Sequence, residues 1–214
     1  MTDLVRAKEI MLREHLAARG ISDSRVLAAF RTVPREEFVP PSFRELAYDD
    51  TPIGIGSGQT ISQPYTVAFM TQLLDPQPAD TVLEVGTGSG YQAAILSRLV
   101  RKVYTVERFK ELGSKAEEVL RRLGYENVEV IIGDGSRGLP ERAPFDGIIV
   151  TAAAPQIPPP LIEQLKVGGR LVIPLGVGVQ EMVRAVKTPA GLEKKVYPGF
   201  RFVPLVGEHG FTFR

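Results

Sequence analysis

LEVGTGSGY, at positions 83–91, joins a short apolar segment to a helical pattern through three closely spaced glycines. The apolar residues of 81–85 predict a buried strand, and the spacing of apolar residues over 91–100 predicts a helix. A strand, a tight glycine turn and a helix form the unit with which doubly wound α/β proteins bind nucleotide-like ligands. We therefore expect a fold of that class around these residues.

The chain after this unit continues to alternate between strand and helix patterns. We expect strands at 102–106, 128–132, 145–150 and 170–174. We expect helices at 110–123 and 161–165. Between 181 and 213 we expect hairpins that are broken at 189–191 and 198–199. Such alternation is typical of an α/β protein with a doubly wound, mostly parallel, Rossmann-like sheet.

The chain before the unit has a different character. Apolar residues at helical spacing predict a helix over 3–19, and a second helix follows with Ser24 as its N-cap. Prolines and glycines predict an ordered loop with little regular structure over 33–63, and loops of this length are usually functional. A further helix is expected from Pro64 until Asp75.

Length and composition predict one globular domain over residues 1–214. Within it we expect N-terminal helices and a loop that serves the substrate over 1–78, a cofactor-binding core over 79–175 and a β-rich C-terminal part over 176–214. Hydrophobic residues make up 43% and charged residues 24% of the chain, which argues against disorder.

Charge and cysteine content exclude several classes of function. The 26 basic and 25 acidic residues leave a net charge of +1, so we expect neither nucleic acid nor membrane as a partner. The chain has no cysteine, which excludes disulfides and thiolate zinc sites, and we assign no metal site. Without a signal-peptide pattern or a long apolar run, a cytoplasmic monomer is expected.

The spacing of the glycines indicates the cofactor. Gly86, Gly88 and Gly90 follow G-x-G-x-G, whereas a dinucleotide loop would follow G-x-G-x-x-G. Glu84 places a carboxylate just before the turn, where it would attract a cationic ammonium group and repel a pyrophosphate. The loop, with Thr87 and Ser89 between its glycines, therefore favours S-adenosylmethionine over NAD.

Acidic residues follow the next two expected strands. Glu107 lies about 20 residues after the glycine loop, where a carboxylate can accept hydrogen bonds from both ribose hydroxyls. Asp134, between Gly133 and Gly135, could accept a hydrogen bond from an adenine amino group, and the glycines would leave room for the ring. The alternative for these residues is a tight turn with solvated acids, and for Asp134 an ordinary turn or cap.

Several segments carry a resemblance to a known family. GQTISQP at 58–64, VPREEFVP at 33–40, LEVGTGSGYQ at 83–92, GDG at 133–135, FDGIIVTAAA at 145–154 and LKVGGRL at 165–171 look like the protein-L-isoaspartate O-methyltransferases. The resemblance covers nearly the whole chain. It is less distinct beyond about position 179, and Tyr65 departs from the residue more usual in that family.

The resemblance implies a class I methyltransferase fold, with a swapped order of the last strands, and a repair function. Such an enzyme moves a methyl group from S-adenosylmethionine, which becomes S-adenosylhomocysteine, to the free carboxylate of an isoaspartyl residue in a protein or peptide. It also implies that Ser62 is the active-site serine. Thr60, Ile61, Thr151 and Ala152 are implied to bind substrate with it.

Other interpretations stay open from the sequence alone. Ser62 precedes a helix and could be only its N-cap. The chain could methylate another carboxylate or small molecule, act as an NAD-dependent oxidoreductase, or bind a ligand without catalysis. A serine hydrolase is disfavoured because no G-x-S-x-G elbow exists and the only histidines, His15 and His209, are expected on the surface.

Overall fold

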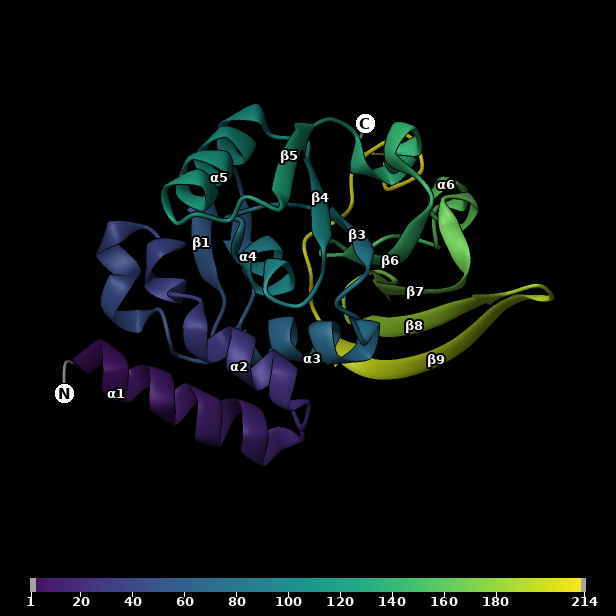
Figure 1. Ribbon diagram of the computed structural model, residues 1–214. Helices are drawn as coiled ribbons and strands as arrows, with labels where there is room; N and C mark the ends of the chain where they lie inside the picture. Colours follow the sequence, from purple (N-terminus) through teal and green to yellow (C-terminus); the bar gives the residue numbers. More distant parts are fainter. Residues whose placement is uncertain (1–2, 213–214) are drawn as a thin grey trace.

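A seven-stranded sheet forms the centre of the computed structural model, which describes residues 3–212 (Figure 1). Positions 1, 2, 213 and 214 of the expected domain lie outside the described residues. The strand order is β5-β4-β3-β6-β7-β8-β9. The strands are β3 (Thr81–Val85), β4 (Lys102–Glu107), β5 (Val128–Ile132), β6 (Phe145–Val150), β7 (Leu165–Leu175), β8 (Gln180–Thr188) and β9 (Gly191–Phe200).

The first five strands run parallel, and the β8–β9 hairpin is antiparallel. The structure therefore confirms the expected doubly wound, mostly parallel sheet. The last three strands adjoin in chain order, and β7 begins five residues before the expected 170 because Leu165 already pairs with Phe145. The expected break at 198–199 is wrong, because these residues continue β9.

Helices cover both faces of the sheet. On one face lie α2 (Ser24–Thr32), α3 (Pro64–Leu74), α4 (Tyr91–Ser97) and α5 (Lys110–Arg122), and on the other lies α6 (Pro159–Glu163). Alternate residues of β3 serve the two cores: Val82 packs under the first group, and Leu83 and Val85 pack toward α6. Within residues 3–212, no helix combines the length and apolar character needed to cross a membrane.

The N-terminal helix occupies the expected 3–19, but its hydrogen bonding changes along its length. It comprises α1 (Asp3–Ile10), a π-helical part η1 (Met11–Leu16) and a 3₁₀ turn η2 (Ala17–Arg19), and it ends at Gly20 in the left-handed conformation. The expectation that Ser24 caps the next helix is wrong. Asp23 is the N-cap of α2, and its carboxylate accepts a hydrogen bond from Arg25 N at 2.8 Å.

The loop expected over 33–63 contains more regular structure than its prolines and glycines suggest. It includes two 3₁₀ turns, η3 (Arg35–Glu37) and η4 (Pro41–Leu46), and a two-stranded hairpin of β1 (Ile53–Gly56) and β2 (Gln59–Ile61). The turn between the strands needs three successive residues with positive φ, from Gly56 to Gly58. The hairpin leads directly into Ser62 and α3.

Helix α3 is capped from a distance at its N-terminal end. The N-cap residue Gln63 makes no side-chain cap, and Asp50 Oδ1 accepts the hydrogen bond from Tyr65 N at 2.9 Å. Arg19 forms an ion pair with the same Asp50 carboxylate. Ser62, which the sequence allowed as a cap, makes no side-chain hydrogen bond within residues 3–212. Capping therefore does not account for Ser62.

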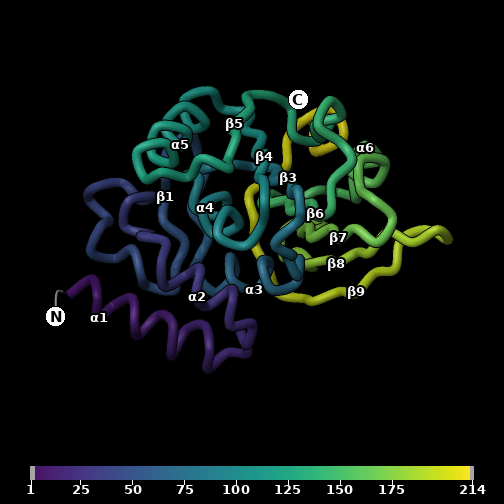
Figure 2. Tube along the Cα trace, in the orientation of Figure 1, coloured from purple at the N-terminus to yellow at the C-terminus, as the bar shows by residue number. Residues whose placement is uncertain are grey.

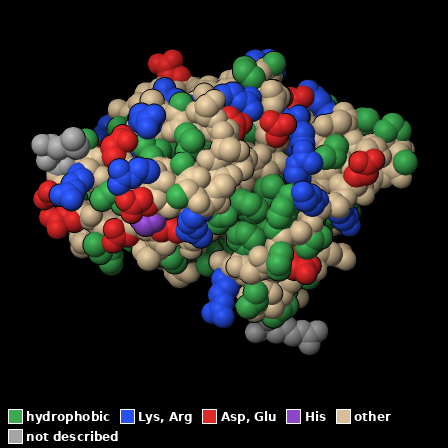
Figure 3. All heavy atoms as spheres, turned by 90° about the horizontal axis from the view of Figure 1, so that it is seen from below, with side chains coloured by type: hydrophobic (Ala, Val, Ile, Leu, Met, Phe, Trp, Pro, Cys, Tyr) green, Lys and Arg blue, Asp and Glu red, His purple; other side chains and the backbone are tan. Residues whose placement is uncertain are grey.

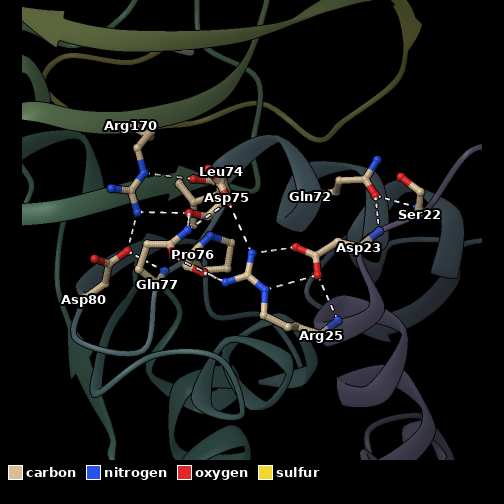
Figure 4. Close-up of polar contacts among 10 residues, drawn as sticks. All are labelled: Ser22, Asp23, Arg25, Gln72, Leu74, Asp75, Pro76, Gln77, Asp80 and Arg170. Atoms are coloured by element: carbon tan, nitrogen blue, oxygen red, sulfur yellow. Dashed lines mark hydrogen bonds and ion pairs between the residues drawn. The ribbon is translucent and has the colours of Figure 1, made fainter.

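Arginine side chains bind the carbonyl groups at the other end of α3 (Figure 4). Arg170 donates to Leu74 O at 3.1 Å and Asp75 O at 3.2 Å, and it pairs with Asp80. Arg184 donates to Leu73 O at 2.7 Å. The last carbonyls of a helix have no partner within it, so these bonds fix where α3 ends.

The outer face of α3 packs against β9 through aromatic rings. The Phe69 ring stacks on Phe200 with centroids 5.5 Å apart and meets Tyr197 edge-on at 5.3 Å. Figure 3 shows apolar side chains gathered in the middle of the face seen from below. Val196 of β9 is one of the exposed apolar residues, with 47% of its surface accessible. The contacts of Phe69 hold the β8–β9 hairpin against α3; this hairpin extends to the right in Figure 1.

We expect Asp50→Ala to lower the free energy of unfolding by about 0.5–2 kcal/mol, because α3 loses its N-terminal cap. Urea unfolding followed by circular dichroism measures the change. Asp49→Ala is the matched control, since the exposed Asp49 side chain makes no contact described for residues 3–212. Equal stability of the two variants would contradict the capping role.

Candidate active site

A cleft opens at the carboxyl ends of β3, β4 and β6, where doubly wound folds bind their ligands. It encloses about 980 Å³ of empty space, part of which is open to solvent. Most of the residues selected from the sequence line it: Thr60, Ile61, Ser62, Glu84, Gly86, Thr87, Gly88, Ser89, Glu107, Gly135, Thr151 and Ala152. Segments that are far apart in the chain are thus brought together here. Gly90 and Asp134 do not line the cleft.

The glycine turn after β3 is held to the neighbouring strand by backbone hydrogen bonds. Gly86 N donates to Val106 O at 2.8 Å, and Gly86 has a φ of 97°. A Cβ atom at Gly86 would lie 2.4 Å from Thr151 Oγ1. Both the conformation and the close approach of Thr151 therefore require glycine at this position.

Gly90 has a different task from the other two glycines of the motif. It precedes α4 with a φ of 87°, and a Cβ atom there would lie 3.3 Å from Ala116 Cβ and 3.2 Å from Leu120 Cδ1. The third glycine thus allows α4 and α5 to pack closely. Gly90 therefore serves helix packing, whereas Gly86 and Gly88 line the cleft.

Glu84 is a buried carboxylate with no hydrogen-bond partner. The residue is 0% exposed, and neither Oε1 nor Oε2 is paired within residues 3–212. Burial raises the pKa of Glu84 to about 8, opposed by the Thr105 hydroxyl and reinforced by the charge of Glu107. Buried polar atoms in proteins are normally satisfied, so this carboxylate at the cleft wall fits a ligand that carries a cationic group.

Glu107 stands at the end of β4 and is 5% exposed. Its Oε2 accepts from Gly88 N at 2.9 Å, and its Oε1 accepts from Phe109 N at 2.9 Å. A carboxylate has about four acceptor positions, so Glu107 can hold the loop and still accept further hydrogen bonds from the cleft. The surface alternative for this residue is thereby disfavoured.

Asp134 is engaged by the protein itself. Its Oδ1 accepts from Ser136 N at 2.9 Å and Ser136 Oγ at 2.7 Å, and its Oδ2 accepts from Glu208 N at 2.8 Å. It is the N-cap of the 3₁₀ turn η5 (Gly135–Arg137). The capping alternative therefore describes Asp134 well, while its neighbour Gly135 reaches the cleft.

The segment after β9 forms a wall of the cleft that sequence reasoning missed. Residues 203–206 line it, and this segment runs back past the strand ends (yellow in Figure 2). Ala153 N donates to Val203 O at 2.8 Å, and Leu205 N donates to Ala153 O at 2.7 Å. No periodic signal in these few residues could have placed them here, because their partners lie about 50 positions earlier.

Ser62 lies where the cleft meets a smaller cavity. The smaller cavity is lined by Pro52, Thr60, Ser62, Gln63, Thr66, Thr151, Arg201, Phe202 and Val203, so Thr60, Ser62 and Thr151 face both spaces. Thr151 Oγ1 donates to Gly86 O at 2.7 Å, which ties it to the glycine loop. Arg201, which the sequence did not single out, adds an exposed positive charge at the edge of the smaller cavity.

Neither histidine lines the two cavities. Both are half-buried, although the sequence suggested surface positions. His209 N donates to Ser136 Oγ at 3.0 Å, so its backbone fastens the C-terminal segment to the turn after β5. A histidine base for Ser62 is therefore lacking in the part of the chain that the structure describes.

Comparisons with known proteins identify the family of the chain. The family model described as protein-L-isoaspartate(D-aspartate) O-methyltransferase matches residues 6–210. Protein-L-isoaspartate O-methyltransferase 2 of Nitrosococcus oceani is 59% identical over 189 residues, which are 87% of this chain and 86% of the relative. The protein of the same name from Pelobacter propionicus is 55% identical over 207 residues, 95% of this chain and 92% of that one.

Solved structures give the same result. A protein-L-isoaspartate O-methyltransferase superposes with a TM-score of 0.84 at 31% identity, over 95% of this chain and 67% of that chain. A candidate β-aspartate methyltransferase from Plasmodium falciparum, in complex with S-adenosyl-L-homocysteine, superposes with a TM-score of 0.79 at 27% identity, over 93% of this chain and 97% of the other. Sequence and fold together confirm the resemblance, and the chain belongs to the protein-L-isoaspartate(D-aspartate) O-methyltransferase family.

Proposed function

We propose that this protein methylates the free carboxylate of L-isoaspartyl residues in damaged proteins and peptides, with S-adenosylmethionine as the methyl donor. The observation that carries the proposal is Ser62, whose unpaired hydroxyl lies between the large cleft and a smaller polar cavity. The family to which the chain belongs supports the reaction. The sequence expectations of one domain and of a cytoplasmic monomer without nucleic-acid or membrane partners carry over as part of the proposal.

The large cleft suits the chemistry of S-adenosylmethionine. We assign the ammonium end of the ligand to Glu84, because an unpaired buried carboxylate gains most from a cation. Glu107 is assigned to the ribose hydroxyls, and the backbone of Gly86, Gly88 and Gly135 leaves space for close approach.

For the adenine amino group, we retain Asp134 only as an indirect contributor. Its carboxylate oxygens already accept hydrogen bonds from Ser136 and Glu208, and it does not line the cleft. Holding this turn in place positions Gly135 and the C-terminal wall around the site. Gly90 is likewise assigned to helix packing.

The smaller cavity is proposed to receive the acceptor carboxylate. Thr60, Ser62 and Thr151 supply polar groups there, and Arg201 adds a positive charge that favours an anionic substrate. Ile61 and Ala152 line the adjoining cleft and would contact the apolar part of the isoaspartyl residue.

The chemistry then depends on position more than on proton transfer. When bound, S-adenosylmethionine supplies a methyl group on a positively charged sulfur. An α-carboxyl group has a pKa of about 3.3–3.7, so the acceptor is ionised at neutral pH and no residue has to remove a proton. Ser62 donates a hydrogen bond to one carboxylate oxygen and leaves the other free to attack the methyl carbon. Correct alignment of two reactants is worth about 7–11 kcal/mol in well-oriented systems.

The alternatives left open by the sequence are less well supported. An NAD-dependent oxidoreductase would place a pyrophosphate beside the glycine turn, close to the buried Glu84 carboxylate. Methylation of a different carboxylate or a small molecule would use the same cleft. An assay with radiolabelled S-adenosylmethionine and an isoaspartyl peptide, against the same peptide with normal aspartate, distinguishes these possibilities.

Binding of S-adenosylhomocysteine should release roughly one proton from Glu84 at pH 6.5. Glu84 in the free protein has a pKa of about 8 and is protonated at that pH, whereas pairing with the ligand's ammonium group requires the ionised form. Calorimetric titration in two buffers with different ionisation enthalpies measures the released proton. Glu84→Gln should abolish the release and weaken binding, and NAD should not bind. Tighter binding of NAD than of S-adenosylhomocysteine would overturn the cofactor assignment.

Glu107→Gln should weaken binding of S-adenosylhomocysteine by about 1–3 kcal/mol, because the amide has one acceptor oxygen in place of two. The dissociation constant from calorimetry checks this. Glu111→Gln is a suitable control, since Glu111 is an exposed residue of α5 paired with Lys115. An unchanged dissociation constant for Glu107→Gln would mean that this carboxylate serves only the loop.

Ser62→Ala should lower kcat and kcat/KM for an isoaspartyl peptide alike, by roughly 10- to 100-fold, which corresponds to one hydrogen bond to a charged group. The melting temperature should stay nearly unchanged because Asp50 caps α3. Single-turnover rates and thermal melts are the measurements, with Ser42→Ala on the exposed turn η4 as control. A variant that melts lower but keeps the wild-type rate would contradict the assignment.

A further inference from the structure

Arg35 is a buried arginine that bridges three segments around the site. The residue is 0% exposed. Its Nε donates to Ala47 O at 2.7 Å, and its Nη2 donates to Ser62 O at 2.8 Å. The guanidinium lies over the Tyr91 ring, 4.7 Å from the centroid, and Tyr91 lines the cofactor cleft.

This buried guanidinium has backbone carbonyls as hydrogen-bond partners and no carboxylate in an ion pair within residues 3–212. Within the same residues, its Nη1 is buried without a hydrogen bond. Buried charges are normally paired, because transfer of an ion out of water is costly. A shorter apolar residue could fill the core here, but it could not hold two carbonyl groups at fixed positions.

We propose that Arg35 is a positioning residue, which fixes the backbone of Ser62 relative to the cofactor cleft. One end of the guanidinium holds the Ser62 carbonyl, and its central carbon lies over the ring of Tyr91, the first residue of α4 after the glycine turn. The distance between the acceptor side and the cofactor side of the site is thus set by one rigid planar group. The inference rests on the proposed role of Ser62.

The geometry explains why Ser62 needs such support. Its hydroxyl has no partner in the described part of the chain, and Gln63 and Pro64 after it offer no side-chain cap. The preceding hairpin β1–β2 pairs only with itself in a two-stranded sheet. Arg35 therefore makes the polar contact that ties the Ser62 backbone to the rest of the protein.

Arg170 provides a matched control, because it binds two carbonyls at the opposite end of the same helix (Figure 4). Its side chain is 16% exposed, and Arg170 lines neither of the two cavities. If these contacts of arginine side chains to backbone carbonyls served stability alone, substitution of either arginine would affect folding and leave the transfer rate per folded molecule unchanged.

The experiment compares Arg35→Met and Arg35→Lys with Arg170→Met and Arg170→Lys. We expect Arg35→Met to lower kcat for an isoaspartyl peptide by roughly 10- to 100-fold, as small misplacements of reacting groups do. Arg35→Lys, which can reach one carbonyl, should recover part of that loss. The affinity for S-adenosylhomocysteine should change by less than about twofold, and both Arg170 variants should keep the wild-type kcat in the folded fraction.

A double-substitution test then asks whether Arg35 acts through Ser62. In the Ser62→Ala background, Arg35→Met should add little further loss of kcat, because the group that it positions is already gone. Full additivity of the two losses would overturn the inference, as would wild-type kcat in Arg35→Met. Arg35 variants that no longer bind S-adenosylhomocysteine would assign the residue to folding of the core and also overturn it.

These results separate the inference from the proposed function. If Ser62→Ala is impaired while Arg35→Met is fully active, the positioning role fails and the role of Ser62 stands. If Ser62→Ala itself turns over at the wild-type rate, the assignment of Ser62 fails, whatever the Arg35 variants do.

Discussion

The attachment of the glycine turn to β4 is the contact on which the rest of the site depends. Gly86 N binds Val106 O, and Glu107 binds Gly88 N, so the turn after β3 is fixed from the neighbouring strand. Parallel strands bring their carboxyl ends to one edge of the sheet. At that edge the turn after β3 begins with Gly86, which has no side chain. Thr151 approaches from the end of β6 into the space that this glycine provides. The cleft exists because three strand ends are held this close.

A second set of contacts stabilises the ends of α3, which begins two residues after Ser62. Asp50 caps the start of the helix, and Arg170 and Arg184 bind the carbonyls at its end. Each of these contacts satisfies backbone groups that a helix leaves unpaired, and each comes from a segment remote in sequence. The aromatic contact between α3 and β9 also brings the following segment, residues 203–206, to the cleft. One helix thus links Ser62 with the C-terminal wall of the cleft.

The charges of the site follow from the same architecture. Glu84 alternates with Leu83 and Val85 along β3, so its carboxylate faces away from the α6 side of the sheet and is buried without a partner. That burial raises the pKa of Glu84, because the charged form loses its hydration. At the edge of the smaller cavity, the exposed Arg201 contributes positive charge. In the proposed function, these two environments would complement a cationic methyl donor and an anionic acceptor.

The sequence by itself determined what depends on local spacing. The period-2 and period-3.6 patterns predicted the parallel strands and the main helices, although β7 begins five residues earlier than expected. The glycine spacing with Glu84 and Glu107 marked residues that line the cleft. The tertiary structure decided which carboxylates accept hydrogen bonds from the protein itself. Asp50 caps α3 in place of Ser62, and Asp134 accepts hydrogen bonds from Ser136 and from the C-terminal segment. Only the fold could place Arg35 against Ser62 or residues 203–206 in the cleft wall. These contacts join residues tens of positions apart, and long-range contacts of this kind leave no periodic signal in the chain.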